Sequence, residues 1–184
     1  MEGCVYSGAV VTLRVSWQIA RAMKFFRLLE DQTLPIPQRE AWDFFSDPGN
    51  LPRITPPWLG FEVTSEPPPR MYPGMVLTYR VRPLLGIPVS WMTEITQVSE
   101  PDYFIDEQRF GPYRLWHHEH RFETAAGGTR VIDTVHYALP AGPLSPLVDR
   151  LIVRRQLANI FGYRRRVLEE RFGKPSSQQF DNPR

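Results

Sequence analysis

The stretch WHHEHRFETAAGGTRVIDTVHYALPAGPL, residues 116–144, holds two strand-like runs joined by a tight turn and followed by a proline-rich break. Within each run, apolar and polar residues alternate, which is typical of an antiparallel hairpin with one face against a core. The turn AAGG, residues 125–128, supplies the glycines that a tight reversal needs. The break PAGP, residues 140–143, ends the second strand because proline cannot donate to the hydrogen-bond ladder.

Further strand-like runs precede this hairpin, separated by turn signals such as Glu-Pro-Asp and Gly-Pro. The spacing between the runs is too short for helical crossovers, so it predicts consecutive antiparallel strands. With the hairpin included, we expect strands at residues 61–65, 76–82, 88–98, 103–110, 114–124 and 129–139.

Before these strands, an apolar run at residues 25–34 predicts a first strand, and PQREAWDFFSDPGNL follows it at residues 37–51. The proline at the start of this stretch suits a first helical turn, and Glu40 suits the helix dipole there. Asp47 followed by Pro48 predicts the N-cap and first turn of a second short helix. Two short helices should therefore follow the first strand.

After the proline-rich break, apolar residues recur at a spacing near 3.6 residues from about 145 to 172, and Gly173 follows. This pattern predicts one long helix. At about 1.5 Å per residue it would span roughly 40 Å, enough to cover one face of the sheet. We therefore expect an α+β fold in which a curved antiparallel sheet wraps around the C-terminal helix and leaves a cavity between them.

The terminal helix also carries a group of basic residues, namely Arg150, Arg154, Arg155, Arg164, Arg165, Arg166 and Arg171. We interpret them as a solvated face whose aliphatic stems cover apolar surface. An anionic membrane or an acidic partner is the alternative. Glu169 and Glu170 interrupt the basic patch and favour the first interpretation.

The order of these elements, together with the stretches at 37–51 and 116–144, resembles the START/polyketide-cyclase superfamily, also described as SRPBCC or Bet v 1-like. The resemblance covers roughly residues 24–173 and implies the helix-grip fold. The second stretch is similar to an uncharacterised bacterial branch, sometimes fused or adjacent to nucleotide-sugar-epimerase-like dehydrogenase domains. It therefore implies such a dehydrogenase as a candidate partner. The superfamily includes lipid carriers, hormone receptors, cyclases and oxygenase subunits, so the fold alone does not decide the chemistry.

Bulk composition narrows the classes of function. The chain has 184 residues, of which 42% are hydrophobic and 23% charged, which fits one globular domain. A net charge of +2 is too small to predict nucleic-acid binding. A single cysteine, Cys4, excludes an intrachain disulfide and a cysteine-based zinc cluster and suits the cytoplasm. No apolar run reaches the roughly 18 residues of a membrane span.

The folded domain is expected at residues 23–174. Residues 1–22 contain Glu2 and Arg14, which a signal peptide would not favour, and Met23 offers an alternative start. We interpret residues 1–22 as an extension that is not native or is poorly ordered, with an amphipathic targeting helix as the alternative. Residues 175–184 have the composition of a disordered tail.

All four histidines lie in the hairpin between residues 117 and 136. Counting outwards from its turn pairs Thr124 with Thr129, Phe122 with Val131, His120 with Asp133, His118 with Val135 and Trp116 with Tyr137. These side chains share one face, which is the more apolar and should look into the cavity. His117 and His136 lie on the other face and should meet water.

Two imidazoles and a carboxylate on an apolar wall need partners, because an unpaired buried polar group costs roughly 1 to 3 kcal/mol. Asp133 lies opposite His120 and would favour its charged form. His118 has no such partner, so we expect it to contact water or a ligand. Three interpretations stay open: structural hydrogen bonds, anchoring of an organic molecule, and chemistry by a His-Asp pair or a metal. Two histidines and one carboxylate leave few metal ligands, so no metal is expected.

The same wall should extend to Trp91 on a neighbouring strand. The register of residues 105–108 depends on turns whose length the sequence does not reveal, and we include Gln108 from this stretch. The candidate ligand-binding residues are Trp91, Gln108, Trp116, His118, His120, Phe122, Asp133 and Tyr137. The main hypothesis is a cytoplasmic protein that binds a small hydrophobic or amphipathic molecule, without a cofactor, nucleic acid or stable membrane insertion.

Two alternatives come from other classes of function. The first is a cyclase, dehydratase or isomerase in which His120 and Asp133 transfer protons. The second is an accessory module of an epimerase-like dehydrogenase. The sequence contains no nucleophile elbow, phosphate-binding glycine loop or HExxH motif, so the enzymatic alternative rests on this one pair of residues.

Overall fold

A curved antiparallel sheet forms the framework of the protein in the computed structural model, which describes residues 24–84 and 86–175. The predicted N-terminal extension lies outside the described residues, as does all of the predicted tail except Pro175. The strands are β1 (Phe25–Leu34), β2 (Glu62–Val63), β3 (Met75–Leu84), β4 (Ile87–Ser99), β5 (Tyr103–Phe110), β6 (Leu115–Ala125) and β7 (Gly128–Ala138).

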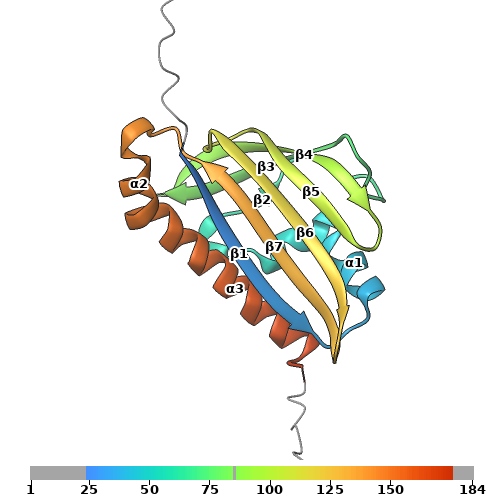
Figure 1. Cartoon of the computed structure of the whole chain (residues 1–184). Helices are drawn as coiled ribbons and strands as arrows, with labels where there is room; N and C mark the ends of the chain where they lie inside the picture. The colour runs from blue at the N-terminus through green and yellow to red at the C-terminus, as the bar shows by residue number, and fades with distance from the viewer. Residues whose placement is uncertain (1–23, 85, 176–184) are drawn as a thin grey trace, which may run out of the picture.

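The spatial order of the strands is β1-β7-β6-β5-β4-β3-β2, and every neighbouring pair is antiparallel. The first and last strands therefore lie side by side, while the others follow chain order (Figure 1). Consecutive antiparallel strands need only short turns, which explains the close spacing of the apolar runs. The expected antiparallel sheet is confirmed.

Helical segments follow β1 and β7. They are α1 (Gln38–Phe45), the 3-10 helices η1 (Pro48–Ile54), η2 (Pro57–Leu59) and η3 (Gly142–Leu144), then α2 (Ser145–Val148), the π-helical segment η4 (Asp149–Val153) and α3 (Arg154–Phe172). Asp47 caps η1 as expected, since its side chain accepts a hydrogen bond from the Gly49 amide at 2.8 Å.

The predicted terminal helix is present, but it is not uniform, because η4 interrupts it as a π-helical turn. The buried Asp149 at the start of η4 accepts a hydrogen bond from the hydroxyl of Tyr137 on β7, with an oxygen–oxygen distance of 2.5 Å. Its second carboxylate oxygen is 3.1 Å from Arg154 Nη2. The π-helical turn thus begins at a residue that is hydrogen-bonded to the sheet. A simple 3.6-residue pattern could not reveal this irregular turn.

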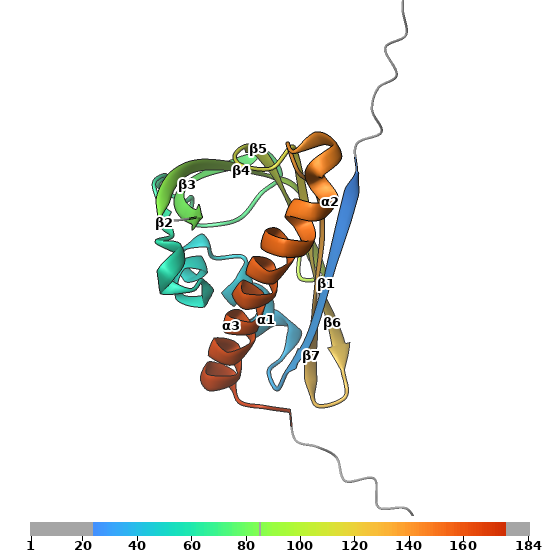
Figure 2. The same ribbon diagram turned by 90° about the vertical axis from the view of Figure 1, so that its left-hand side faces the viewer.

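Helix α3 crosses the concave side of the sheet, as Figure 2 shows most clearly. One apolar cluster forms between α1 and the sheet, where Trp42 packs edge-on against Phe104 and Phe122 with ring centroids 5.9 Å apart in both cases. A second cluster joins β7 to α3 through Val135 and Phe161. Within the described residues, no helix combines the length and apolar character needed to cross a membrane.

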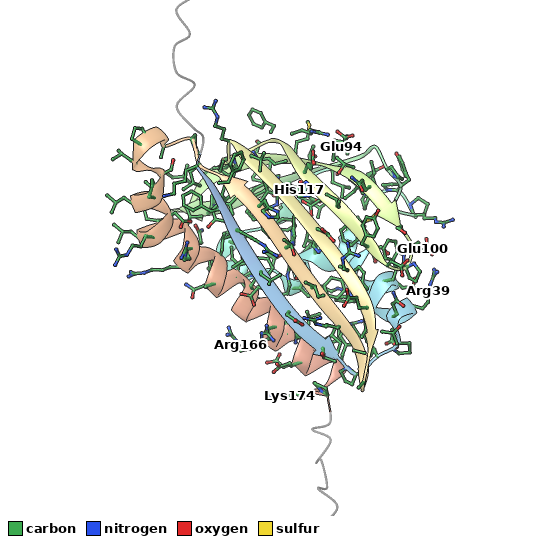
Figure 3. The ribbon with its side chains drawn as sticks, viewed as in Figure 1. Arg39, Glu94, Glu100, His117, Arg166 and Lys174 are labelled. Atoms are coloured by element: carbon green, nitrogen blue, oxygen red, sulfur yellow. The ribbon has the colours of Figure 1, made fainter. Side chains whose placement is uncertain are left out.

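The predicted register of the β6–β7 hairpin is confirmed at every pair, from Thr124 with Thr129 to Trp116 with Tyr137. His118 and His120 are buried on the inner face. His136 is exposed, and the half-buried His117 lies on the outer face beside Glu107, as Figure 3 illustrates for His117. Period-two alternation therefore assigned the histidines to the correct faces of the sheet.

Candidate functional site

A cavity of about 190 Å³ lies between the sheet and α3. Strands β3 to β6 form its curved wall, η1 and η2 border it, and α3 closes it from the other side. Most of its lining is apolar, with large contributions from Leu77, Ile95, Phe104, Trp116, Leu157 and Phe161. The cavity is larger than the engineered apolar cavities of roughly 150 Å³ that bind benzene, so a small organic molecule fits its size and character.

Several buried ionisable side chains gather at one place on this largely apolar wall. Asp106 from β5, His118 and His120 from β6 and Arg164 from α3 all line the cavity. Asp133 from β7 lies behind the two histidines and is 5% exposed. Five polar side chains from four different elements thus meet in the interior, although burial of such groups is unfavourable unless they are paired.

Two carboxylates hold the pair of histidines. Asp133 Oδ1 forms a hydrogen bond with His118 Nε2 at 3.0 Å. The same oxygen is 2.7 Å from His120 Nδ1, but that contact does not have hydrogen-bond geometry. Asp106 Oδ2 is 3.0 Å from His120 Nε2 and 3.4 Å from His118 Nδ1. The two imidazole centroids are 3.7 Å apart. Each ring therefore has one nitrogen beside each carboxylate.

The expectation that His118 lacks a protein partner is therefore wrong. His120 does contact Asp133 across the ladder as expected, but His118 forms the better-aligned hydrogen bond to the same carboxylate. A side chain can reach a residue diagonally across the ladder, and the position directly opposite does not decide the contact.

Burial lowers the pKa of His118, and the charge on neighbouring His120 lowers it further. Burial acts against the charged form of His120 too, but the contacts with Asp106 and Asp133 outweigh it and raise its pKa. Burial opposes ionisation of the two carboxyl groups, yet the contacts with the histidines lower both pKa values, that of Asp133 well below its usual range. Of the two adjacent imidazoles, His120 therefore holds a proton more readily than His118.

Arg164 was expected on a solvated helix face, and the structure corrects this. Its side chain is 8% exposed, and it shares the buried side of α3 with Leu157, Phe161 and Leu168. Its guanidinium lies over the Phe161 ring, 4.9 Å from the centroid, with Nη1 3.6 Å from Asp133 Oδ2. Exposed Arg166 marks the opposite, solvent side of the helix (Figure 3).

The nitrogen and oxygen atoms of Asp106, His118 and His120 that could bind a metal ion lie within 4.8 Å of one another. Two imidazoles and one carboxylate form a donor set that transition metals use in other proteins. Asp133, which would be the third ligand in the metal alternative, contacts a nitrogen of each ring instead. Hydrogen bonds within the cluster already account for the grouping of these side chains.

Four of the eight candidate ligand-binding residues line the cavity: Trp91, Trp116, His118 and His120. Trp91 and Trp116 pack edge to face with ring centroids 5.4 Å apart and form one end of the wall. The indole nitrogen of Trp91 donates a hydrogen bond to Thr93 Oγ1 at 3.0 Å, which leaves the ring faces for apolar contact.

The other four candidates do not line this cavity. Phe122 packs into the core against Trp42, and Asp133 lies behind the histidines. Tyr137 directs its hydroxyl to Asp149. Gln108 Nε2 donates to the Tyr113 carbonyl oxygen at 2.6 Å and so closes the β5–β6 turn. A shared strand face is therefore not enough to place a side chain in the cavity.

Two functional candidates were missed by sequence reasoning, Asp106 and Arg164. Arg164 follows Leu157 by seven residues and precedes Leu168 by four, so helical spacing placed it on the buried stripe and could have revealed it. Asp106 had no comparable signal, because its place opposite His118 depends on the register of β5 against β6, across a connection whose length the sequence did not reveal. Asp106 lies next to His118 because β5 pairs with β6 in this register.

Comparison with known proteins gives one family and many similar folds. The sequence model described as polyketide cyclase / dehydrase and lipid transport matches residues 34–161. Protein TTHA0849 from Thermus thermophilus is 20% identical, with a TM-score of 0.60 over 81% of this chain and 97% of its own. Major latex-like protein 151 from Panax ginseng is 13% identical, with a TM-score of 0.59 over 80% and 97%.

Protein Ms6760 from Mycobacterium smegmatis is 21% identical, with a TM-score of 0.57 over 79% of this chain and 92% of its own. At these identities the likeness establishes the helix-grip fold alone. No curated protein gives a significant match to the sequence.

Proposed function

This chain belongs to the polyketide cyclase / dehydrase and lipid transport family, and we propose that it binds a small hydrophobic or amphipathic molecule between the sheet and α3. The observation that carries the proposal is the distribution of polarity around the cavity. Most of the lining is apolar, and the buried acidic and basic residues in it are gathered in the cluster that contains Asp106, His118, His120 and Arg164. Such an arrangement suits a ligand with an apolar body and one polar end.

Apolar contact supplies most of the affinity in this proposal. Burial contributes about 25 cal/mol per Å² before the cost of ordering the ligand is subtracted. Trp91 and Trp116 present ring faces to the body of the ligand, while the histidine cluster orients its polar end. Gln108, Tyr137 and Phe122 then support the walls from outside the cavity.

The proposal is tested with N-phenyl-1-naphthylamine, a neutral apolar probe whose fluorescence rises in apolar surroundings. We expect saturable binding of one probe molecule to the wild-type protein. Ile160 lines the cavity from α3 and is half-buried, so Ile160→Trp fills part of the cavity and lowers the affinity by about tenfold or more.

Ile152→Trp is the matched control, because Ile152 is 42% exposed on the preceding η4 turn and does not line the cavity. It should leave the affinity within about twofold. Equal affinity of the wild type and the Ile160→Trp variant, with both proteins folded, would contradict binding in this cavity.

Proton transfer to a bound molecule is a second candidate function, favoured by the two histidines 3.7 Å apart on the cavity wall. Oppositely shifted pKa values in adjacent groups are typical of an acid and a base that act together. In this version His118 accepts a proton from the ligand and His120 returns one to it, as in an isomerase or dehydratase. Asp133 contacts both rings and keeps them in place.

Deuterium exchange into 2-tetralone tests this second candidate. If His118 removes an acidic C–H proton beside the carbonyl, NMR in D₂O should show exchange above the buffer rate. His118→Gln should return the rate to that of buffer while N-phenyl-1-naphthylamine still binds. Exposed His136→Asn is the control and should change neither. Exchange at the buffer rate with the wild type would leave ligand binding as the function.

The place of action and the partner belong to the same proposal. The single cysteine supports a location in the cytoplasm. The resemblance of residues 116–144 to a branch associated with epimerase-like dehydrogenases supports such a protein as a partner. Fractionation of its native cells tests the location. Affinity purification of the full chain from those cells tests the partner, and a partner without a dehydrogenase domain would contradict the second statement.

A further inference from the structure

One buried arginine in the cavity lacks hydrogen-bond acceptors for part of its guanidinium group. Arg164 is 8% exposed, and its Nε and Nη1 atoms are buried with no hydrogen-bond partner among the described residues. The nearest carboxylate oxygen is Asp133 Oδ2, which lies 3.6 Å from Nη1 and therefore beyond hydrogen-bond distance. An unmet donor on a charged group is among the costliest features of a protein interior.

Two other arginine–carboxylate pairs of this protein have the hydrogen-bond geometry that the pair of Arg164 and Asp133 lacks. On the surface, Arg109 Nε donates to Glu94 Oε2 at 2.6 Å, and Arg121 Nε donates to Glu119 Oε1 at 2.8 Å. Asp133 does not serve Arg164 in the same way, because its Oδ2 atom lies 3.6 Å from Nη1 while its Oδ1 atom contacts His118 and His120.

The Arg164 side chain also borders the space that the proposed ligand would occupy. Arg164 lines the main cavity together with Leu157 and Phe161 from the same helix. Phe161 supports the guanidinium from one side at 4.9 Å, which limits the directions in which it can turn. An acceptor placed in the cavity would therefore meet donors that are already dehydrated and held in position.

We propose that Arg164 recognises a negatively charged group, such as a carboxylate, at the polar end of the bound molecule. This inference rests on the proposed ligand-binding function and narrows it to organic acids with an apolar body. The histidines and Asp106 border the same end of the cavity and complete its polar wall. A neutral ligand would offer Arg164 only an uncharged acceptor, whereas a carboxylate forms the stronger charge-assisted hydrogen bond, and the site therefore discriminates by charge.

The test compares 2-naphthoate with 2-naphthylmethanol, which share a ring system and differ in charge. Titration of the wild-type protein at pH 7 should show the acid binding about tenfold or more tightly than the alcohol, as expected for a charge-assisted hydrogen bond in a dry site. Arg164→Met should remove this preference and leave the affinity for the alcohol within about twofold. Arg164→Lys should keep part of the preference.

Arg166→Met is the matched control, because Arg166 is exposed on the opposite side of α3. It should leave both affinities unchanged and so exclude a general effect of helix charge. Equal affinities for acid and alcohol in the wild type would overturn the inference without any need for a variant to fold. An equal loss for both probes in Arg164→Met would also overturn it, because Arg164 would then serve only the shape of the cavity.

The binding results for the three probes distinguish a failure of this inference from a failure of the proposed function. If N-phenyl-1-naphthylamine binds the wild type and 2-naphthoate does not, the cavity binds ligands but does not select for acids. If none of the three probes binds, both the inference and the proposed function are wrong for ligands of this size.

Discussion

His118 and His120 lie two residues apart on β6, yet their surroundings move their pKa values in opposite directions. Both rings are buried, and both contact Asp106 and Asp133. His120 has closer contacts with the two carboxylates, 3.0 and 2.7 Å compared with 3.4 and 3.0 Å for His118. The first ring to become charged then disfavours charge on the second.

These shifts predict a pH dependence of stability. The raised pKa of His120 contributes stability below about pH 6.5, the unfolded value, and this is lost as the pH rises through the folded value. The lowered pKa of His118 has the opposite effect, and stability falls as the pH drops below about 6.5 towards its folded value. For these two groups together, the free energy of unfolding should therefore be greatest near pH 6.5.

Urea unfolding at several pH values measures this dependence. His120→Asn should flatten the decline on the alkaline side, whereas exposed His136→Asn should leave it as in the wild type. A free energy of unfolding that rises steadily from pH 6.5 to 8.5 in the wild type would contradict the assignment of the charge to His120.

At the scale of elements, Asp149 joins the start of the terminal helix to β7. Tyr137 and Asp149 are both 2% exposed, and their hydrogen bond lies where the helix adopts its π-helical turn. Burial and this hydrogen bond raise the pKa of Tyr137, so the phenol remains a donor at neutral pH. The contact holds the start of the terminal helix against β7, ahead of the part of the helix that lines the cavity.

Tyr137→Phe should therefore lower the free energy of unfolding by about 1 to 3 kcal/mol, because a buried carboxylate oxygen loses its donor. Tyr103→Phe is the control, since the Tyr103 hydroxyl is 3.5 Å from Gln97 at the exposed side of the sheet. It should cost less than about 0.5 kcal/mol. Chemical denaturation measures both variants, and equal losses would show that the contact with Asp149 contributes little.

A second element-scale prediction concerns the turn between β6 and β7. Gly128 has φ of +143°, and an added Cβ would overlap the carbonyl oxygen of Leu34 at the end of β1. Gly127 has φ of +82°, but a Cβ there would meet open space. The close approach of Gly128 lets β1 end directly against the hairpin, where Leu34 pairs with Thr129.

Gly128→Ala should lower the free energy of unfolding by roughly 3 kcal/mol or more, because backbone strain and a steric clash add together. Gly127→Ala should cost about 1 kcal/mol from its backbone conformation alone. Thermal unfolding compares the two variants. A smaller loss for Gly128→Ala than for Gly127→Ala would show that β1 can shift away from the turn at little cost.

At the scale of the whole molecule, the cavity and stability are linked, because a ligand that binds only the folded state stabilises it. A concentration of N-phenyl-1-naphthylamine one hundred times its Kd should add about 2.7 kcal/mol and raise Tm by about 5 to 10 °C. Ile160→Trp, with an affinity about tenfold lower, should reduce this increase by about half at the same concentration. Calorimetry measures it, and an unchanged wild-type Tm would show that the probe does not bind the folded state preferentially.

Local sequence patterns were sufficient for the order of the elements, the antiparallel hairpin register and the faces of the four histidines. Each depends on local information: the period of two in strands, the period of 3.6 in helices, and the conformations that glycine and proline favour. The pairing of His120 with Asp133 followed from counting residues outwards from one short turn. A single turn leaves little freedom in register, so counting was sufficient there.

Apart from His120 and Asp133, which polar groups meet depends on the tertiary structure. Asp106 reaches the histidines through the β5–β6 pairing, which sets it opposite His118. Arg164 reaches Asp133 because α3 rests on the sheet in one particular rotation. Gln108 donates its side-chain hydrogen bond to Tyr113 in the adjacent loop, and Tyr137 donates one to Asp149. Contacts of this kind join residues far apart in the chain. They depend on how whole elements fit together, and no local periodicity encodes that fit.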